Sequence, residues 1–434
     1  MNPMMGQMGM NPMMCQMGMN PMMGQMGMNP MMGQMRMNTM VGQMGMSPMM
    51  VQMGMNPMMG QIGANTMMND MNQMMNMMQQ MNMNQTTSPH INQNSEFEQM
   101  KKELEELKKR NTILENNQKK YEEQFKKQYQ KEENEKLKER TERIIKDEEK
   151  IKAQEKNLNY KFNEYGQLLN NETLQKIEKV SQKEYDKIAK YLRIYIRYLL
   201  LKKYDMFIQY VPTDKNEINF YKRIKEIPQS YILCTDDLET NPTCLVIICG
   251  SGQVVSGLFA QSACINENLD QGSIIPYINR ARKNNYSVIV FNPNQNYDLD
   301  DEKKEVKFEK DHWNYVYSNI IKKIKIIKNI IFMAHSAGAS KVIKIIENNS
   351  EDIKSNKIKC IVFTDCFSNY DSLPDDVKNK ALKITRNYVS SKKSLGTFIE
   401  KRHDISCYSA GDDRHEYTSY SAVEEIFMFI KQMI

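Results

Sequence analysis

The sequence predicts an α/β fold over residues 158–434, with a mainly parallel sheet flanked by helices. The first observation is that short apolar runs alternate with segments whose apolar residues recur at helical spacing. The second is that glycines and polar side chains directly follow several of these runs. The third is a change of composition near residues 97 and 158, which separates this region from residues 1–96 and 97–157.

The expected strands are five short, almost continuous apolar runs, a pattern typical of strands buried on both faces of a sheet. They are CLVIICG (244–250), SVIVF (287–291), IIFMA (330–334), CIVFT (360–364) and ISCYS (405–409). Helical spacing between them predicts three helices, which are marked by Trp313 to Ile327, Val342 to Ile346 and Val423 to Ile430.

Residues 1–96 form a methionine-rich segment that we expect to be disordered. It contains 35 of the 40 methionines in its first 90 residues, and residues 1–72 repeat with a period of nine that begins MNPMMGQMG. Proline recurs with glycine and asparagine in the repeats, so no helix or strand is expected to continue through several units. The segment is either adhesive toward hydrophobic grooves, because methionine adapts to irregular surfaces, or a replicated repeat without a specific function.

Residues 97–157 are rich in Lys, Glu and Gln. From Phe97 to Phe125 apolar residues recur at spacings of three and four, with Asn111 and Gln118 at intervening core positions. This pattern predicts a coiled coil of about four heptads and a homodimer through it. The alternative is a single charged helix, which fits better after residue 126. The interleaved charges indicate a solvated surface rather than a nucleic-acid site, and the net charge of +6 adds only weak attraction for polyanions.

The eight cysteines are dispersed, without paired two-residue spacing or a secretory signal pattern. We therefore expect reduced thiols in a nuclear or cytoplasmic protein, no structural zinc and no cofactor. The apolar stretch YLRIYIRYLLL (191–201) is too short for a membrane span, and Arg193 and Arg197 interrupt it. We expect no membrane segment.

Candidate functional residues follow the expected strands, because functional groups collect at the carboxyl ends of parallel strands. These positions are Gly250, Ser251 and Gly252, then His335, Ser336, Ala337 and Gly338, then Asp365 and Cys366, and finally Gly411, Asp412, Asp413, Arg414 and His415. The order Ser, Asp, His is that of the α/β-hydrolase triad. The sheet is therefore expected to be of the α/β-hydrolase type.

Ser336 is the expected nucleophile, within the segment AHSAGA. It lies where an apolar run ends and a helical pattern starts, as a serine on a strand-to-helix turn would. Ala334 and Gly338 are small because a larger side chain would collide with neighbouring backbone. Ala334 replaces the first glycine of the usual motif.

His415 is the expected base, because a catalytic base needs a pKa near neutrality and the chain has five histidines. His90 belongs to the methionine-rich segment, His312 is expected to head a surface helix, His335 lies on the turn itself, and His403 precedes its strand. Only His415 follows a strand end and precedes the last helix.

Asp365 is the expected acid, since it ends the strand after the nucleophile and could orient the imidazole. Asp413 is the alternative, although it could equally hydrogen-bond within its own turn. Backbone amides near the nucleophile are the expected oxyanion donors, and the glycine pair among them could instead form only a tight turn. These donors are Gly250, Ser251, Gly252 and Ala337.

Several longer motifs resemble the Arb2 domain, named for an Argonaute-binding protein of fungi and found in animal cotranscriptional regulators. They are YKFNEYGQL, YILCTDDLETNP, the stretch from CLVIICGSGQ to FNPNQNY, FMAHSAGA, VFTDC and SAGDDRHEYTS. The resemblance covers residues 158–434 and implies an α/β-hydrolase-like fold with Ser336, Asp365, Asp413 and His415 at matching positions. This chain has Cys249 where members usually have a histidine, and a shorter segment between Tyr297 and Trp313.

Two hypotheses of function follow. The resemblance implies a nuclear component of Argonaute-directed silencing, chromatin or splicing assemblies, with RNA contacted through protein partners. The Ser, Asp and His residues instead favour a serine hydrolase of esters, thioesters or related acyl groups.

Overall fold

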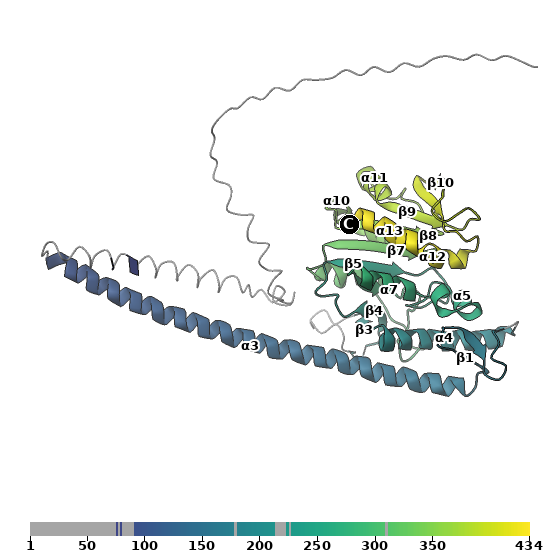
Figure 1. Cartoon of the computed structure of the whole chain (residues 1–434), viewed down its shortest axis with the longest axis horizontal. Helices are drawn as coiled ribbons and strands as arrows, with labels where there is room; N and C mark the ends of the chain where they lie inside the picture. The colour runs from purple at the N-terminus through teal and green to yellow at the C-terminus, as the bar shows by residue number, and fades with distance from the viewer. Residues whose placement is uncertain are drawn as a thin grey trace, which may run out of the picture. The chain divides into compact units, whose positions relative to one another are not determined.

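The computed structural model describes residues 75–76, 79, 91–177, 180–212, 223–224, 227–308 and 311–434. The disorder predicted for residues 1–96 falls almost entirely outside these ranges. The longest element is α3 (Ile91–Glu155), a continuous helix of 65 residues that includes the whole heptad segment (Figure 1). It begins before residue 97, and the coiled coil stays a prediction.

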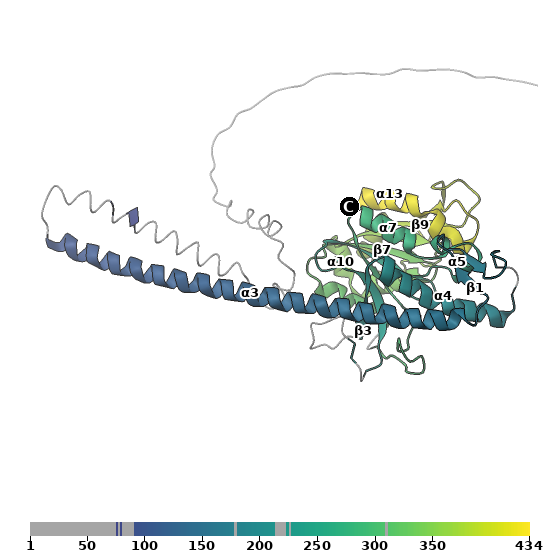
Figure 2. The ribbon, with the colours of Figure 1, turned by 60° about the horizontal axis from the view of Figure 1, so that its bottom comes forward.

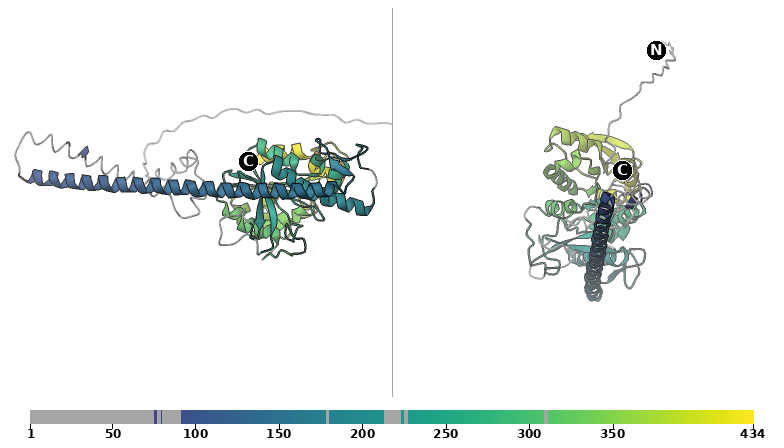
Figure 3. Two further views of the ribbon diagram at one scale, coloured as in Figure 1. Left: turned by 90° about the horizontal axis from the view of Figure 1, so that it is seen from below. Right: turned by 90° about the vertical axis from the view of Figure 1, so that its left-hand side faces the viewer.

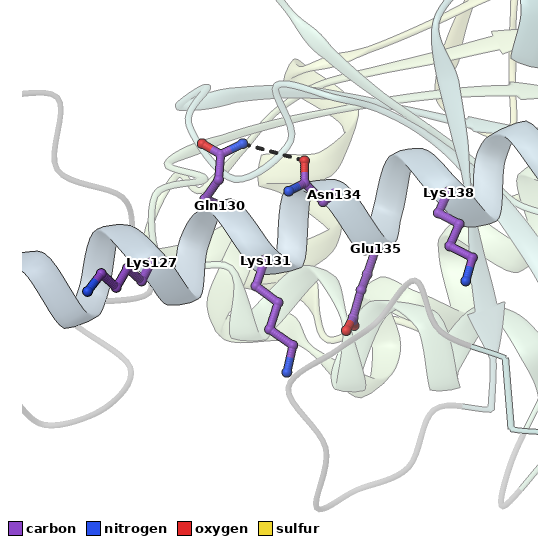
Figure 4. Close-up of a pocket in the computed structure, with 6 residues that line it drawn as sticks. All are labelled: Lys127, Gln130, Lys131, Asn134, Glu135 and Lys138. Carbon is purple, nitrogen blue, oxygen red and sulfur yellow. Dashed lines mark hydrogen bonds between the residues drawn. The ribbon is translucent and has the colours of Figure 1, made fainter.

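The surface of α3 carries mixed polar and charged side chains. Figure 4 shows Lys127, Lys131 and Lys138 extending from one stretch of the helix, with Gln130 and Glu135 between them. Ion pairs three or four residues apart, such as Lys138 with Glu142 at 3.9 Å, recur along the helix. Exposed pairs of this kind contribute little to stability, so α3 depends on packing where it meets the rest of the fold.

The core is a sheet of nine strands within the described part of the chain, in the order β10-β11-β9-β8-β7-β5-β6-β4-β3. The five neighbouring pairs in the middle of this order are parallel: β6 with β5, β5 with β7, β7 with β8, β8 with β9, and β9 with β11. The outer pairs are antiparallel: β3 with β4, β4 with β6, and β10 with β11. The bounds are β3 (Met206–Val211), β4 (Ser230–Thr235), β5 (Thr243–Ile248), β6 (Ser287–Val290), β7 (Asn329–His335), β8 (Ile358–Thr364), β9 (Thr385–Val389), β10 (Phe398–Arg402) and β11 (Ile405–Ser409). A separate hairpin pairs β1 (Tyr160–Phe162) with β2 (Leu168–Asn170).

Helices cover both faces of the sheet, which explains why its central strands are apolar on both sides. One apolar cluster joins the sheet to α4 (Gln182–Lys203), α7 (Ile275–Lys283) and α13 (Val423–Met433). A second joins the opposite face to α8 (His312–Asn319), α9 (Gly338–Asn348), α10 (Ser350–Lys354) and α11 (Asp375–Lys383). The shorter helices are α5 (Gln261–Asn266), α6 (Leu269–Gly272) and α12 (Thr418–Ser421).

The mainly parallel α/β fold and its five expected strands are confirmed, but the helix expected from Trp313 to Ile327 is wrong in extent. It ends at Asn319 and is followed by a 3₁₀ turn over Ile321–Lys323. The continuation is rich in isoleucine, whose β-branched side chain lowers helix propensity. The amides of Lys328 and Asn329 donate to the carbonyl of Pro242 at the start of the sheet.

The C-terminal part of α3 packs beside α4 and β3, as Figures 2 and 3 show. Arg197 on α4 donates two hydrogen bonds of 2.7 Å to Asp147 on α3, and the Asp147 side chain is fully buried. Arg143 of α3 forms a second forked pair with Asp300, at 2.8 and 3.0 Å. The packed unit therefore starts N-terminal of residue 158, where we expected the ordered domain to begin.

The stretch 191–201 lies in α4, where it packs in the core. No helix among the described residues combines the length and the apolar character needed to span a bilayer. Every cysteine that the structure describes is an unpaired, buried thiol.

Candidate active site

Ser336 occupies the turn between β7 and α9 at the carboxyl edge of the sheet. Its backbone has a φ of +52°, in the left-handed region that non-glycine residues rarely adopt. Its amide donates to the carbonyl of Thr364 at 2.8 Å, which holds the turn against the end of β8. Strain of this kind, about 1–3 kcal/mol, persists only where surrounding contacts impose it.

Two glycines allow β5 to approach this turn closely. A Cβ atom on Gly338 would lie 2.7 Å from the carbonyl oxygens of both Ile248 and Cys249. A Cβ atom on Gly250 would lie 3.2 Å from the Cβ of Ser336. The small residue expected at position 338 is therefore required by backbone contact, and Gly250 brings the loop after β5 against the nucleophile turn.

His415 and Asp365 are joined directly. The Nδ1 of His415 donates to the Oδ2 of Asp365 at 2.7 Å, and the backbone amide of Ser390 donates to Oδ1 at 3.3 Å. Asp365 directly follows β8 with a φ of +49°, and its side chain is only 5% exposed, whereas that of His415 is 47% exposed. The acid is thus buried and fixed while the imidazole remains open to solvent.

This contact shifts both pKa values. The hydrogen bond that His415 donates to Asp365 raises the pKa of His415 above its ordinary value, although partial burial opposes the shift. Burial alone would raise the pKa of Asp365, but hydrogen bonds from His415 and Ser390 outweigh it and the pKa falls. Because Asp365 holds Nδ1, the Nε2 atom is the nitrogen of His415 left for proton transfer.

Asp413, the alternative acid, pairs instead with Lys392 at 3.7 Å. The geometry brings Asp365 and not Asp413 to His415. Ser336 follows β7 at the same edge of the sheet, and no hydrogen bond of its hydroxyl occurs among the residues that the structure describes. In free enzymes the hydrogen bond between nucleophile and base is often formed only with substrate.

The expected oxyanion donors divide into two kinds. Gly250 and Ala337 flank the nucleophile turn, and no hydrogen bond within the described ranges uses either amide. Ser251 and Gly252 are exposed, and Gly252 has a φ of +111° with open space around it. The first pair therefore lies beside Ser336, whereas the second pair forms the outer, exposed part of the turn.

A family model described as "Arb2 domain" matches residues 139–311 and 304–395. The chain belongs to the Arb2 domain family. It is similar to Cotranscriptional regulator ARB2A homolog of Xenopus tropicalis, with 30% identity over 336 residues that cover 62% of this chain and 77% of the relative. It is also similar to Cotranscriptional regulator ARB2A of Homo sapiens, with 28% identity over 338 residues that cover 63% and 79%.

Two solved structures are similar to this Arb2 chain at 12% sequence identity. One is a histone deacetylase from Saccharomyces cerevisiae, with a TM-score of 0.38 and coverage of 57% of this chain and 98% of that chain. The other is a hormone-sensitive lipase from a metagenome library, with a TM-score of 0.30 and coverage of 59% and 100%. The assignment of the fold rests on the strand order and on the Arb2 match, which begins at residue 139 inside α3.

Cys249, the residue directly after β5, is buried. Burial raises the pKa of its thiol to about 12, so it is a neutral thiol near pH 7. The side-chain amide of Asn294 reaches its sulfur at 3.6 Å and donates to the carbonyls of Gly250 and Val254 at 2.8 and 2.9 Å. Asn294 therefore holds both ends of the loop after β5 in the Arb2 chain.

Sequence reasoning missed this asparagine and a buried polar group beneath His415. The Nδ1 of His335 lies 3.1 Å from the Thr364 hydroxyl and 3.2 Å from that of Ser419, and its ring centre is 4.7 Å from that of His415. Burial lowers the pKa of His335 to about 4, so the imidazole under His415 is neutral. A histidine directly before the nucleophile was visible in the sequence, but Ser419 became a partner only through folding.

The surface position expected for His312 is wrong. Its side chain is buried between Phe291 and Phe308, with ring centres 6.0 and 5.3 Å away, and burial lowers its pKa to about 3. His312 has no contact with Ser336 or Asp365 among the described groups, so it does not compete with His415. No cluster of three or more potential metal ligands occurs within the part of the chain that the structure describes.

Proposed function

We propose that this chain is a cotranscriptional regulator that acts in the nucleus by binding other proteins. The observation that carries the proposal is family membership, together with relatives named cotranscriptional regulators that match over 77–79% of their own lengths. In finer detail, the partners are components of Argonaute-directed silencing, chromatin or splicing assemblies, and RNA is reached through them.

The helix α3 supplies a second binding surface in this proposal. Leu114 and Tyr121, which lie on the heptad face together with Asn111 and Gln118, are 38% and 58% exposed. Apolar residues on a long helix are typical of coiled-coil contacts, which supports a homodimer through this part of α3. Sedimentation equilibrium of the full chain tests it, with the variant Leu114→Ser/Tyr121→Ser as comparison. A monomer at all concentrations would contradict the dimer.

Purification of the tagged full chain after crosslinking tests the regulator proposal. We expect recovery of unspliced nascent RNA together with Argonaute, chromatin or splicing proteins. Ser336→Ala should recover the same partners if binding is the function, because the substitution removes one hydroxyl from a half-buried turn. Recovery of none of these proteins, or of mature cytoplasmic RNA alone, would refute the proposal.

A second candidate function is a serine acyl hydrolase, which is favoured by the Asp365–His415 hydrogen bond at 2.7 Å beside the strained Ser336 turn. The Ser336 oxygen would attack the acyl carbon while Nε2 of His415 takes its proton. The leaving alcohol or thiol would depart with that proton, and water activated by His415 would release the acid. Amides of Gly250 and Ala337 would stabilise the oxyanion.

A fluorophosphonate probe tests this candidate directly, since it forms a covalent bond with activated serines. We expect wild-type protein to be labelled and Ser336→Ala to be unlabelled. Ser340→Ala is the matched control, because Ser340 is an exposed serine in the first turn of α9, four residues after Ser336, and its hydroxyl donates to the Ala337 carbonyl. Folded wild-type protein that stays unlabelled would remove the hydrolase candidate.

A further inference from the structure

A groove lies at the amino ends of β9 and β11, between the ends of α11 and α13. We call it the Arg386 groove and define it by Lys383, Arg386, Lys401, Tyr408 and Phe429. It lies at the opposite edge of the sheet from Ser336. Arg386 and Ser390 are four residues apart along β9 and its end, which corresponds to about 13 Å of extended chain. The groove is therefore separate from the candidate active site.

The guanidinium of Arg386 packs against two aromatic rings. Its Cζ atom lies 4.2 Å from the ring centre of Phe429 and 4.8 Å from that of Tyr408. Cation–π contacts with these two rings orient the planar group, and the Tyr388 hydroxyl is a further hydrogen-bond partner. Among the residues described, no carboxylate lies within ion-pair distance of Arg386. This is a preorganised donor fork without an anion.

Two lysines near Arg386 are likewise uncommitted. Lys383 and Lys401 are exposed, and neither forms an ion pair within the described part of the chain. Lys378 differs, because Asp371 at 2.7 Å and Asp404 at 3.7 Å already neutralise it. The groove thus carries a local positive charge from Lys383, Arg386 and Lys401, and Asp375 and Asp404 lie at its border.

We propose that the Arg386 groove binds a phosphorylated serine or threonine side chain of a partner peptide. A planar guanidinium makes two parallel hydrogen bonds to a phosphate, and nearby lysines add to the attraction for a dianion. A continuous polyanion such as RNA fits less well, because its backbone would have to pass Asp375 and Asp404, which also line the groove. One dianion on an otherwise neutral or basic peptide fits this charge arrangement.

Fluorescence anisotropy with the full chain and two labelled peptide pools tests the proposal. Both pools have randomised flanking positions, and they differ only in a central phosphoserine or serine. We expect the phosphoserine pool to bind at least about tenfold more tightly, because hydrogen bonds between charged groups lower Kd by about this factor. Arg386→Gln should remove this difference, and Lys383→Gln/Lys401→Gln should reduce it several-fold.

Two variants control for misfolding and for general charge. Arg386→Lys keeps the positive charge but loses the fork, so we expect intermediate binding at unchanged thermal stability. Lys328→Gln removes an exposed lysine just before β7, also at the amino edge of the sheet, and should bind like wild type. Equal binding of the two pools, or full binding by Lys383→Gln/Lys401→Gln, overturns the proposal. Tighter binding of oligouridylate than of the phosphoserine pool overturns the choice of ligand.

Discussion

Substitution of Asp147 by alanine should strongly destabilise the fold, although position 147 belongs to a segment that looks like a charged surface helix. The carboxylate is fully buried and accepts two hydrogen bonds of 2.7 Å from Arg197, whose side chain is 7% exposed. Its loss leaves an uncompensated buried charge, which costs about 3–5 kcal/mol. For a folded unit of this size, that corresponds to a fall in Tm of roughly 6–20 °C.

Urea unfolding followed by tryptophan fluorescence measures this loss. The chain has one tryptophan, Trp313, which packs against the cluster on the face of the sheet opposite α4. Its signal therefore reports unfolding of the sheet rather than fraying of α3. Glu142→Gln is the control on the same helix, because Glu142 is 61% exposed and pairs with Lys138 only at 3.9 Å. It should change the free energy of unfolding by less than about 0.5 kcal/mol.

A double-mutant cycle separates the ion pair from general damage to the helix interface. Asp147→Ala/Arg197→Met leaves no unpaired charge, so it should be more stable than Asp147→Ala alone. Two results would refute the reasoning. One is a loss below about 1 kcal/mol for Asp147→Ala, and the other is a double variant as unstable as the sum of the two single variants.

Three further predictions concern the candidate active site. Gly338→Ala should destabilise the fold by about 1–3 kcal/mol in urea unfolding and abolish probe labelling, because the new methyl group would overlap the carbonyls that end β5; unchanged stability would contradict this. Asp365→Asn should slow fluorophosphonate labelling by at least about 100-fold, because Asp365 bonds His415, whereas Asp413→Asn should slow it by less than about twofold, because Asp413 pairs with Lys392. A larger effect of Asp413→Asn would make Asp413 the acid. The labelling rate of Ser336 should rise with pH as His415 loses its proton, and the midpoint should lie above the ordinary histidine pKa because Asp365 raises the pKa of His415. Asp365→Asn should lower this midpoint, and a pH-independent rate would exclude His415 as the base.

The parts of the fold that could be predicted are those whose strands are uniformly apolar. β5, β7 and β8 are buried on both faces and read as continuous runs of Val, Ile, Leu and Phe. β9, with the sequence TRNYV, was missed because Arg386 and Asn387 interrupt the pattern. Arg386 packs against the rings of Tyr408 and Phe429, and Asn387 donates to the Cys366 carbonyl at 2.9 Å, so neither side chain breaks the strand.

The order of residues along the chain predicted the pairing of Asp365 with His415 because strand ends of a parallel sheet meet at one edge. The same reasoning could not find Asn294, whose three contacts depend on how the loops after β5 and β6 approach each other. It also read Asp147 as part of a solvated surface, because its partner Arg197 is 50 residues away along the chain.

The buried cysteines allow local opening of the sheet to be measured by the rate at which their thiols are alkylated. Cys234, Cys244, Cys360 and Cys407 belong to β4, β5, β8 and β11, and all four are shielded from solvent. An alkylating reagent reaches each thiol only when its strand separates from its neighbours, so the rate of modification measures the free energy of that opening. Peptide mass spectrometry after timed alkylation would rank the strands from the centre of the sheet to its edges without introducing any label.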